Sequence, residues 1–287
     1  MADVIVLGSG PAGISASLYV KRAGLNAVVI GRGGGSLEKA DKIENYYGFP
    51  EPVDAGELIK NGIAQAKRLG IPVIKDEVVS LSYLDRYVVE TKSAQFEADS
   101  VILATGSSRK SPPIPGLGDF EGKGISYCAV CDAFFYRNRP VAVLGDSEYA
   151  FHEAAELMPT ASSVVLLTNG REPAVALPKG LPVIKKEIAA FEGKEVLQSV
   201  RFRDGSAYAV SGVFIALGVA GSADLARKLG ARTEGVAVLV DENMQTNVPG
   251  LFAAGDCTGG LLQISKAVYE GAKAGTSAVK FIRSKKR

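Results

Sequence analysis

The sequence has few of the side chains that build disulfide frameworks or metal sites. Its 287 residues include three cysteines and one histidine. A small disulfide-stapled domain needs a denser set of cysteines, and a tetrahedral zinc site needs four ligands at short spacings. Cys257 and His152 do not stand at ligand spacing from each other or from the other two cysteines. We therefore expect no metal and no structural disulfide framework, and we interpret Cys257 as a small buried hydrophobic side chain.

Long apolar runs and a strong net charge are also lacking. No run approaches the ~20 apolar residues that a membrane-spanning helix needs. Residues 1–4 lead into a strand-like segment with no signal-peptide pattern before it. Lys and Arg number 33 against 31 Asp and Glu, so the net charge of +2 does not indicate a nucleic-acid partner. We expect a cytoplasmic protein with no membrane and no nucleic-acid partner.

The first informative pattern is a strand, a glycine-rich turn and a helix near the start of the chain. Val4–Leu7 is an apolar run, residues 12–21 have helical spacing, and Ala27–Ile30 is a second apolar run. A crossover between two parallel strands has this order and a length of about thirty residues. The sequence therefore predicts a βαβ unit whose first turn is rich in glycine.

The glycines of that turn match the spacing of a pyrophosphate-binding turn. Gly8 permits the tight turn, Gly10 lets the backbone approach a phosphate, and Gly13 lets the helix pack on the strand. The helix N-terminus then offers free N–H groups and a positive dipole to an anion. The alternative is an ordinary tight turn. Because the second strand is followed by Gly31 and Arg32 rather than by an acidic residue, the turn does not follow the common NAD pattern.

A second unit of the same kind lies in the middle of the chain. Val141–Gly145, Glu148–Leu157 and Val164–Leu167 have the patterns of a strand, a helix and a strand. This order repeats that of the first unit. The sequence therefore predicts an α/β fold with two dinucleotide-binding (Rossmann-like) domains.

A proline-rich stretch suggests where the two domains meet. Residues 111–118 contain three prolines, which remove backbone donors and stiffen a connection. We interpret this stretch as a linker and predict that the smaller domain is inserted in the larger one. The larger domain would use residues 1–114 and 213–287, and the smaller one residues 115–212.

Cys128 and Cys131 are separated by two residues, so both thiols emerge from one turn and can close a small, reversible disulfide ring. Half of a zinc site is the alternative for such a pair, but the missing ligands argue against it. A dithiol that shares a chain with a dinucleotide-binding turn suggests that electrons pass between a bound dinucleotide and a disulfide.

Several motifs taken together resemble the low-molecular-weight thioredoxin reductase family. They are the first glycine turn, Ala104–Gly106, Cys128–Asp132, Gly255–Asp256 and Ile43–Phe49, and they follow the family's order over essentially the whole chain. The run CAVCDAFFYRNRPVAVLG, which begins at Cys128, is the most specific of them. The resemblance implies a homodimeric FAD enzyme that reduces thioredoxin through a dithiol on its inserted domain.

The resemblance also implies roles for individual residues. Cys131 would face the flavin and Cys128 would attack thioredoxin, because one thiolate attacks and the other cysteine resolves the mixed disulfide. Asp132 is similar to the family's acid, which protonates a leaving thiolate. Two positions depart from the family, which often has Gln at Ser36 and Arg at Leu262. Contacts to FAD are implied for Gly8, Ser9, Gly10, Pro11, Ala12, Gly13, Gly31, Arg32, Leu37, Asn45, Val78, Ala104, Thr105, Gly106, Gly255, Asp256, Gln263 and Ile264.

The second glycine turn departs most from the NADPH-dependent members of that family. Ser147 stands where a glycine must let the backbone approach a phosphate, and Asp146 and Glu148 add two carboxylates. Like charges ~4 Å apart repel by about 4 kcal/mol at an effective dielectric near 20. No basic cluster follows Leu167 to bind a 2′-phosphate. We therefore expect that NADPH does not bind; a tolerant NADPH site built from other residues is the alternative.

Without NADPH the electrons must come from another donor. The chain resembles a group of thioredoxin reductase-like flavoenzymes that keep the dithiol, have eroded NADPH motifs and take electrons from ferredoxin. Basic residues that could steer an acidic ferredoxin are Arg109, Lys110, Arg137, Arg139 and the stretch 271–287, which has no acid. A solvated C-terminal helix is the alternative for that stretch.

Two other functions remain open from the sequence. One is an ordinary NADPH-dependent thioredoxin reductase. The other is a non-catalytic flavin protein whose dithiol senses the redox state and switches binding to a partner. The ferredoxin-dependent reductase is our prediction, because it accounts for both the intact dithiol and the altered second turn.

Overall fold

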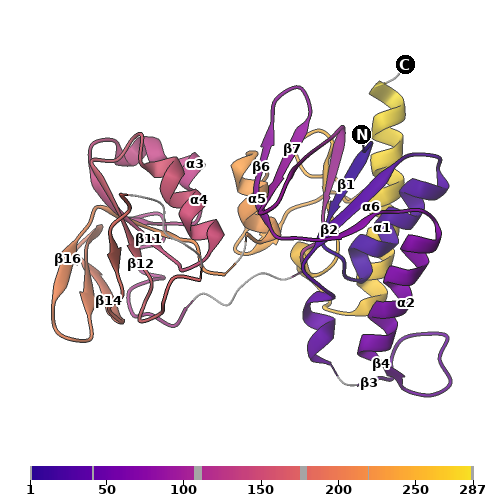
Figure 1. The fold of residues 1–287 in the computed structure, drawn as a ribbon, viewed down its shortest axis with the longest axis horizontal. Helices are drawn as coiled ribbons and strands as arrows, with labels where there is room; N and C mark the ends of the chain where they lie inside the picture. Colours follow the sequence, from indigo (N-terminus) through magenta and orange to yellow (C-terminus); the bar gives the residue numbers. More distant parts are fainter. Residues whose placement is uncertain (1, 41, 107–111, 175–179, 219, 286–287) are drawn as a thin grey trace. The chain divides into compact units, whose positions relative to one another are not determined.

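A computed structural model describes residues 2–40, 42–106, 112–174, 180–218 and 220–285, without the side chains of Lys39, Val130 and Cys131. The chain divides into two compact units (Figure 1). The first unit comprises Met1–Ser108 and Gly221–Arg287, and the second comprises Arg109–Ala220.

The first unit is built on a parallel five-stranded sheet with the order β20-β9-β1-β2-β5. The strand β1 lies in the centre, with Val4 opposite Ala27 on one side and Ser100 on the other. Strands buried on both faces have continuous apolar sequences, as β1 does. The strand bounds are β1 Val4–Leu7, β2 Ala27–Gly31, β5 Val73–Lys75, β9 Ser100–Leu103 and β20 Leu251–Ala253.

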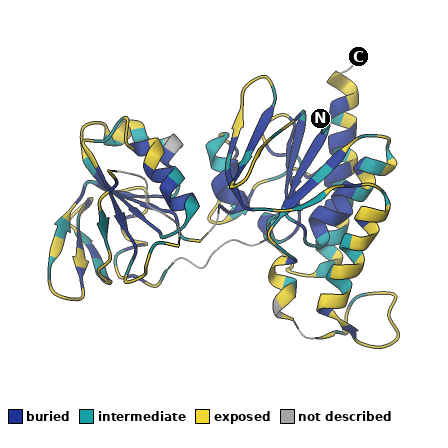
Figure 2. Ribbon diagram, viewed as in Figure 1, coloured by how far each residue is buried: buried dark blue, intermediate teal, exposed yellow. Residues whose placement is uncertain are grey.

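Helices pack against this sheet, and most residues of its strands are buried (Figure 2). The first helix α1 and the last helix α6 run side by side (Figure 1). Two glycines of α6 make the close approach possible: a Cβ on Gly271 would lie 2.1 Å from the carbonyl oxygen of Ala12, and one on Gly275 would lie 2.4 Å from that of Ala16. The helix bounds are α1 Pro11–Arg22, α2 Ala55–Arg68, α5 Ser222–Lys228 and α6 Ile264–Lys285.

Short elements complete the first unit. An antiparallel three-stranded sheet has the order β6-β7-β8, and two small hairpins pair β3 with β4 and β18 with β19. Two short 3₁₀ helices, η1 and η3, lie in connecting segments that follow β2 and β20. The bounds are β3 Lys42–Ile43, β4 Val53–Asp54, β6 Val78–Tyr83, β7 Tyr87–Thr91, β8 Gln95–Ala98, β18 Thr233–Glu234, β19 Ala237–Val238, η1 Gly35–Lys39 and η3 Asp256–Thr258.

The second unit repeats this plan. Its parallel sheet has the order β10-β17-β11-β12-β13, and its antiparallel sheet has the order β14-β15-β16. The helix α4 follows β11 as α1 follows β1. The bounds are β10 Ile125–Ser126, α3 Ala129–Asp132, η2 Ala133–Tyr136, β11 Pro140–Leu144, α4 Glu148–Leu157, β12 Ser163–Leu167, β13 Val183–Ile184, β14 Ile188–Gly193, β15 Leu197–Phe202, β16 Ala207–Ala209 and β17 Gly212–Ile215.

The two units differ in the origin of one edge strand. The edge strand β20 of the first unit comes after the inserted unit, whereas the corresponding strand β10 of the second unit precedes β11 in the chain. Each unit otherwise has a strand, helix and strand crossover, a third strand, an antiparallel meander and a return to the sheet. The predicted fold class, α/β with two Rossmann-like units, is confirmed.

The proline-rich stretch is not a linker where the structure describes it. Ile114 and Leu117 are buried in the core of the second unit, together with Phe120 and Ile125. An apolar residue that packs into a core gains burial free energy, which a free connection lacks. The compact units change over at Ser108/Arg109 and at Ala220/Gly221, each a few residues outside the predicted insertion of residues 115–212. Ser111 lies outside the described residues.

The contact between α1 and α6 leads to a stability prediction. We expect Gly271→Ala to lower the free energy of unfolding by about 1–3 kcal/mol, because the added methyl group overlaps a backbone carbonyl that cannot move away easily. Gly62→Ala in α2 is the matched control, since its Cβ would meet nothing closer than 3.7 Å. Alanine favours a helix over glycine, so the control should be neutral or stabilising. Urea unfolding of both variants measures the difference, and equal stabilities would contradict this packing.

Candidate redox site

The first glycine turn is shaped by close contacts between backbone segments. Gly8 has a φ of +119°, and a Cβ there would lie 2.1 Å from the carbonyl oxygen of Ala104 at the end of β9. A Cβ on Gly13 would lie 1.9 Å from the carbonyl oxygen of Gly8. A Cβ on Gly31, at the end of β2, would lie 2.7 Å from the amide nitrogen of Ser9. These three positions therefore accept only glycine for steric reasons within the protein itself.

Gly10 differs from its neighbours, because space rather than protein surrounds the position of its missing side chain. The nearest atom to a Cβ there would be the carbonyl oxygen of Gly34, at 3.6 Å. Gly10 is the N-cap of α1, no side chain caps this end of the helix, and Pro11 occupies the first turn. The first N–H groups of α1 thus have no side-chain cap, and an uncapped helix N-terminus is an arrangement that binds a phosphate. The Oγ of Ser9 donates to the carbonyl oxygen of Gly33 at 2.7 Å and ties the turn to the segment after β2.

The Gly255–Asp256 turn lies against the same helix end. Gly255 has a φ of +85°, and a Cβ there would lie 2.8 Å from the Cβ of Ala12. The amide of Gly255 donates to Oε2 of Glu270 at 2.8 Å. The Nζ of Lys266 lies 3.1 Å from the same Oε2 and donates to the carbonyl oxygen of Gly255 at 2.8 Å. Two predicted cofactor segments far apart in the sequence therefore meet at the first turn.

Sequence reasoning missed Glu270 and Lys266, which fix the Gly255–Asp256 turn from α6. Their spacing of four residues on a helix is the signal that could have revealed the pair. Burial raises the pKa of Asp256 above its ordinary value; Lys266 opposes this rise and Glu270 adds to it. The carboxylate of Asp256 therefore stands in a partly dry, charged environment that favours a hydrogen bond to a bound polar group.

Two other predicted residues are joined by a hydrogen bond. The Nδ2 of Asn45 donates to Oε1 of Gln263 at 2.9 Å, although 218 positions separate them in the chain. The Oγ1 of Thr105 lies 2.7 Å from the Oγ of Ser222, at the start of α5. Ser222 could not be predicted from the sequence, because a lone serine at the start of a short helix has no distinctive pattern. The structure thus brings Asn45 and Gln263 together and adds Ser222 beside Thr105.

The remaining predicted residues lie around these turns. Ala104 and Val78 are buried, Leu37 is half-buried in η1, and Ile264 begins α6. The side chain of Arg32 is mostly exposed, with its Nε 3.7 Å from Oε2 of Glu77. Glu77 is buried and also pairs with Lys92 at 3.2 Å, so it would keep a basic partner if Arg32 turned toward a bound group.

The dithiol turn lies in the second unit, between β10 and η2. Cys128 is buried and disulfide-bonded, and Cys131 belongs to the short helix α3, with its side chain outside the described residues. Cys257 is a free, buried thiol in the first unit, and burial raises its pKa to about 11. The prediction that Cys257 is a small buried side chain is therefore confirmed.

Ser126 holds the acid of the dithiol motif in place. Its Oγ donates to Oδ2 of Asp132 at 2.7 Å and accepts the amide N–H of Cys128 at 3.1 Å. One hydroxyl thus connects the backbone of a cysteine with the carboxylate at the far end of the turn. Sequence reasoning missed Ser126, since its position two residues before the first cysteine becomes meaningful only when the turn folds back.

Two aromatic side chains that follow this turn are exposed to solvent. Phe134 and Phe135, in η2, are 74% and 69% exposed, and their rings meet edge to face with centroids 6.4 Å apart. Tyr136 is packed instead against Phe214, and burial raises its pKa, with the charge of Asp132 adding to the rise. The first two rings are thus available to another molecule, whereas the third is part of the core.

The second glycine turn has the same backbone contact as the first but a different surface. A Cβ on Gly145 would lie 2.2 Å from the carbonyl oxygen of Ala216, as one on Gly8 would from Ala104. The Oγ of Ser147 donates to the carbonyl oxygen of Gly218. These two contacts, one steric and one a hydrogen bond, tie the turn to the segment that follows β17.

Asp146 is paired within the chain rather than directed at an open crevice. Its Oδ2 lies 3.4 Å from Nη1 of Arg171, and its carbonyl oxygen accepts the amide of Ala174 at 2.7 Å. The segment Arg171–Ala174 therefore folds back over the turn where a dinucleotide phosphate would enter. Negative charge at Glu148 adds to the unfavourable surroundings for an anion.

Neither a metal centre nor a membrane span is found in the described part of the chain. No three His, Cys, Asp or Glu side chains gather there as a set of metal ligands. No helix there is both long and apolar enough to cross a bilayer.

Comparison with known proteins identifies a family. The model of the pyridine nucleotide-disulphide oxidoreductase family matches residues 2–271. A thioredoxin reductase of Aquifex aeolicus is 34% identical over 99% of this chain and 94% of its own length. The crystal structure of an atypical thioredoxin reductase from Desulfovibrio vulgaris Hildenborough has a TM-score of 0.93 and 40% identity, and covers 99% of both chains. A ferredoxin-flavin thioredoxin reductase from Clostridium acetobutylicum has a TM-score of 0.70 and 28% identity, covering 99% of this chain and 98% of its own.

The open space at Gly10 leads to a binding prediction. We expect Gly10→Ala to fold normally, because its Cβ meets no protein atom within 3.6 Å, yet to weaken dinucleotide binding at least tenfold, because the methyl group enters the phosphate's place. Cofactor retained on purification, followed by titration of the stripped protein, measures this. Gly118→Ala, whose Cβ would meet nothing within 4 Å in the second unit, is the control. Unchanged affinity in Gly10→Ala would show that the dinucleotide binds elsewhere.

Proposed function

Because the chain belongs to the pyridine nucleotide-disulphide oxidoreductase family and is a flavoprotein disulfide reductase of the thioredoxin reductase type, we propose that it takes electrons from reduced ferredoxin rather than from NADPH. The electrons would pass through FAD to a Cys128–Cys131 disulfide and from there to thioredoxin. NADPH-dependent thioredoxin reductase is the alternative within the same family.

The observation that carries this proposal is the state of the second glycine turn. In a turn that binds a dinucleotide, the backbone at the middle glycine approaches the phosphate and the helix end stays open. Here Ser147 occupies that position and is bonded to Gly218, while Asp146 is engaged with Arg171 and Ala174. A pyrophosphate would have to break these contacts and then face the uncompensated carboxylates of Asp146 and Glu148. The energetic cost of doing so favours another electron donor.

The first glycine turn, by contrast, fits FAD. Gly10 and the uncapped end of α1 would hold the pyrophosphate, Asp256 would accept a hydrogen bond from the ribityl chain, and Asn45 with Gln263 would lie beside the ring. When bound, FAD supplies a carrier that accepts electrons one at a time and delivers two. The half-buried network of Lys266 and Glu270 would keep the Gly255–Asp256 backbone rigid for this contact. The site's donors therefore suit an adenine dinucleotide with a flavin ring.

The dithiol turn supplies the disulfide chemistry. In the proposed sequence, the thiolate of Cys128 attacks one sulfur of the thioredoxin disulfide and forms a mixed disulfide, and the other thioredoxin sulfur leaves as a thiolate. Asp132, held by Ser126, gives that leaving thiolate a proton. Cys131 then attacks Cys128, which restores the Cys128–Cys131 disulfide and releases the second thioredoxin sulfur. Two electrons pass in each cycle, so two reduced ferredoxins are consumed.

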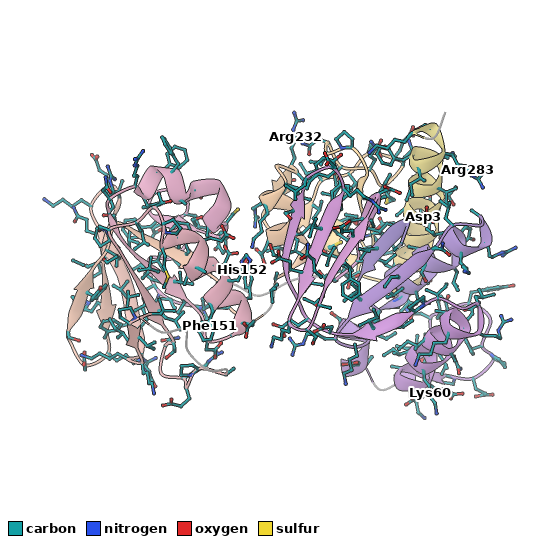
Figure 3. The ribbon with its side chains drawn as sticks, turned by 45° about the horizontal axis from the view of Figure 1, so that its top comes forward. Asp3, Lys60, Phe151, His152, Arg232 and Arg283 are labelled. Atoms are coloured by element: carbon teal, nitrogen blue, oxygen red, sulfur yellow. The ribbon has the colours of Figure 1, made fainter. Side chains whose placement is uncertain are left out.

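Exposed basic side chains support an acidic electron donor. Lys280, Arg283 and Lys285 lie on the outer turns of α6, where Figure 3 labels Arg283, and Arg137 and Arg139 are exposed in the second unit. Arg109 and Lys110 lie outside the described residues. Opposite charge on two proteins raises the rate at which they meet. We also propose, from the family likeness, that the enzyme works as a homodimer in the cytoplasm.

An anaerobic titration tests the electron donor. We expect reduced ferredoxin to bleach the flavin absorbance within seconds, and NADPH and NADH at equal concentrations to leave it unchanged, because the second turn does not accept a nicotinamide nucleotide. The Asp146→Gly, Ser147→Gly double variant tests the cause, since removing the charge and the hydroxyl should strengthen NADH binding. Bleaching of the unaltered protein by NADPH would overturn the proposal in favour of the NADPH-dependent enzyme.

Charge reversal on α6 tests the docking of ferredoxin. We expect Lys280→Glu with Lys285→Glu to slow the second-order reduction of the flavin by ferredoxin about tenfold at low salt, and the difference to shrink as salt screens the charges. Stopped-flow absorbance at several ionic strengths measures the rates. Lys60→Glu with Lys67→Glu, two exposed residues of α2 of which Figure 3 labels Lys60, is the control for the same change of net charge. Equal rates for the double variant and the unaltered protein would place the docking site elsewhere.

A further inference from the structure

The dithiol turn is anchored by a buried carboxylate that belongs to the helix after the second glycine turn. Glu153, in α4, is 1% exposed, and its Oε2 accepts the amide N–H of Ala129 at 2.8 Å. Ala129 is the residue directly after Cys128 and begins α3. The two helices α3 and α4 are in contact. The carboxylate of Glu153 thus contacts the backbone between the two cysteines, although Glu153 and Ala129 are 24 positions apart in the chain.

We propose that Glu153 is a positioning residue for disulfide exchange, which fixes the dithiol turn by its hydrogen bond and opposes the formation of thiolate there by its negative charge. This inference rests on the proposed redox role of Cys128 and Cys131. It does not depend on which electron donor reduces them, because it concerns the thiols of the second unit alone.

Burial makes the charge of Glu153 effective. A charge in the protein interior is screened far less than one in water, so it acts strongly on a thiolate that forms on the same turn. The N–H groups at the start of a helix normally stabilise a cysteine thiolate and lower its pKa. Glu153 occupies one of these N–H groups, that of Ala129, and replaces its partial positive charge with a nearby negative one. Both effects favour the protonated thiol.

The titratable and charged groups that the described residues bring near Glu153 come from α4 and α3. On α4, His152 has its Nδ1 3.9 Å from Oε1 of Glu153 and its Nε2 3.8 Å from Oε1 of Glu156; Figure 3 labels His152 on this helix. Tyr149 lies one turn earlier on the same helix and is buried. On α3 the titratable residues are Cys131 and Asp132, and Cys128 directly precedes this helix. The strands β11 and β12, which pack against α4, contribute apolar residues and Ser163.

The inference also assigns a role to the contact between α4 and the dithiol turn, in a unit whose glycine turn is altered. In a dinucleotide-binding unit, the helix after the glycine turn presents its N-terminus to the phosphates. Here that N-terminus carries Asp146, Ser147 and Glu148, and the contact that the helix makes with the redox motif comes from its middle instead. The middle of α4 therefore contacts the dithiol turn, whichever group lies at the N-terminus of this helix.

The test is the rate of alkylation of the reduced full-length protein by iodoacetamide between pH 5 and pH 10. We expect Glu153→Gln, which keeps an oxygen for the N–H of Ala129 but loses the charge, to lower the pKa of the reactive thiol by about one unit. Glu156→Gln, an exposed neighbour one turn further along α4, should leave the profile unchanged. Cys257 does not interfere, because it is buried and its pKa is about 11.

A second variant keeps the inference testable if Glu153→Gln does not fold. Glu153→Asp retains the charge with a shorter reach, so its pH profile should stay close to that of the unaltered protein even if thermal unfolding shows a lower stability. A profile of Glu153→Gln that matches the unaltered protein would reduce Glu153 to a structural anchor and overturn the inference. A marked fall in the thiol pKa of Glu153→Asp would do the same. The alkylation profiles concern the thiols alone, so they remain a valid test even if ferredoxin does not reduce the flavin.

Discussion

Both units of this protein depend on one close approach of backbone to backbone. At the end of the central strand of each parallel sheet, β1 and β11, a glycine faces the carbonyl oxygen at the end of the neighbouring strand, Gly8 against Ala104 and Gly145 against Ala216. The central strand has its sequence successor on one side and a later strand on the other, so a crevice opens where the strand order reverses. The geometry that makes a nucleotide crevice is therefore present twice. What differs is the set of side chains at its mouth.

The two glycine turns therefore share a backbone geometry but differ in the groups that they offer to a ligand. In the first unit the crevice is lined by Gly10 and the uncapped end of α1, which leaves N–H groups free for an anion. In the second, Ser147 and Asp146 use their polar groups within the chain. A fold can thus keep its packing after its ligand-binding surface has changed, because burial of the strands and helices, not the ligand, stabilises the unit. The altered unit still presents the dithiol, through contacts between α3 and α4.

Much of this architecture could be predicted from local patterns. Apolar runs and helical spacing located β1, α1, β11 and α4, and the helix Glu148–Leu157 was predicted to the residue. The strand β14 and the helix α5 were not predicted, since β14 mixes small and charged residues and α5 is short. The proline-rich segment was misread as a linker because composition does not reveal that Ile114 and Leu117 enter the core. The glycine turns and the dithiol were visible in the sequence, whereas Ser126, Ser222, Glu153 and the pair of Lys266 and Glu270 act through partners that only the fold brings near.

The late position of β20 and α6 in the chain has a consequence for biosynthesis. A ribosome makes the inserted unit in one continuous run, so it can condense as soon as it has emerged. The first unit lacks its edge strand β20 and the helix α6, which packs on α1, until the inserted unit has been made. The segment of the first unit that precedes the insertion therefore keeps part of its apolar surface uncovered while the second unit is synthesised. Docking of α6 on α1 is a late step in the assembly of the first unit.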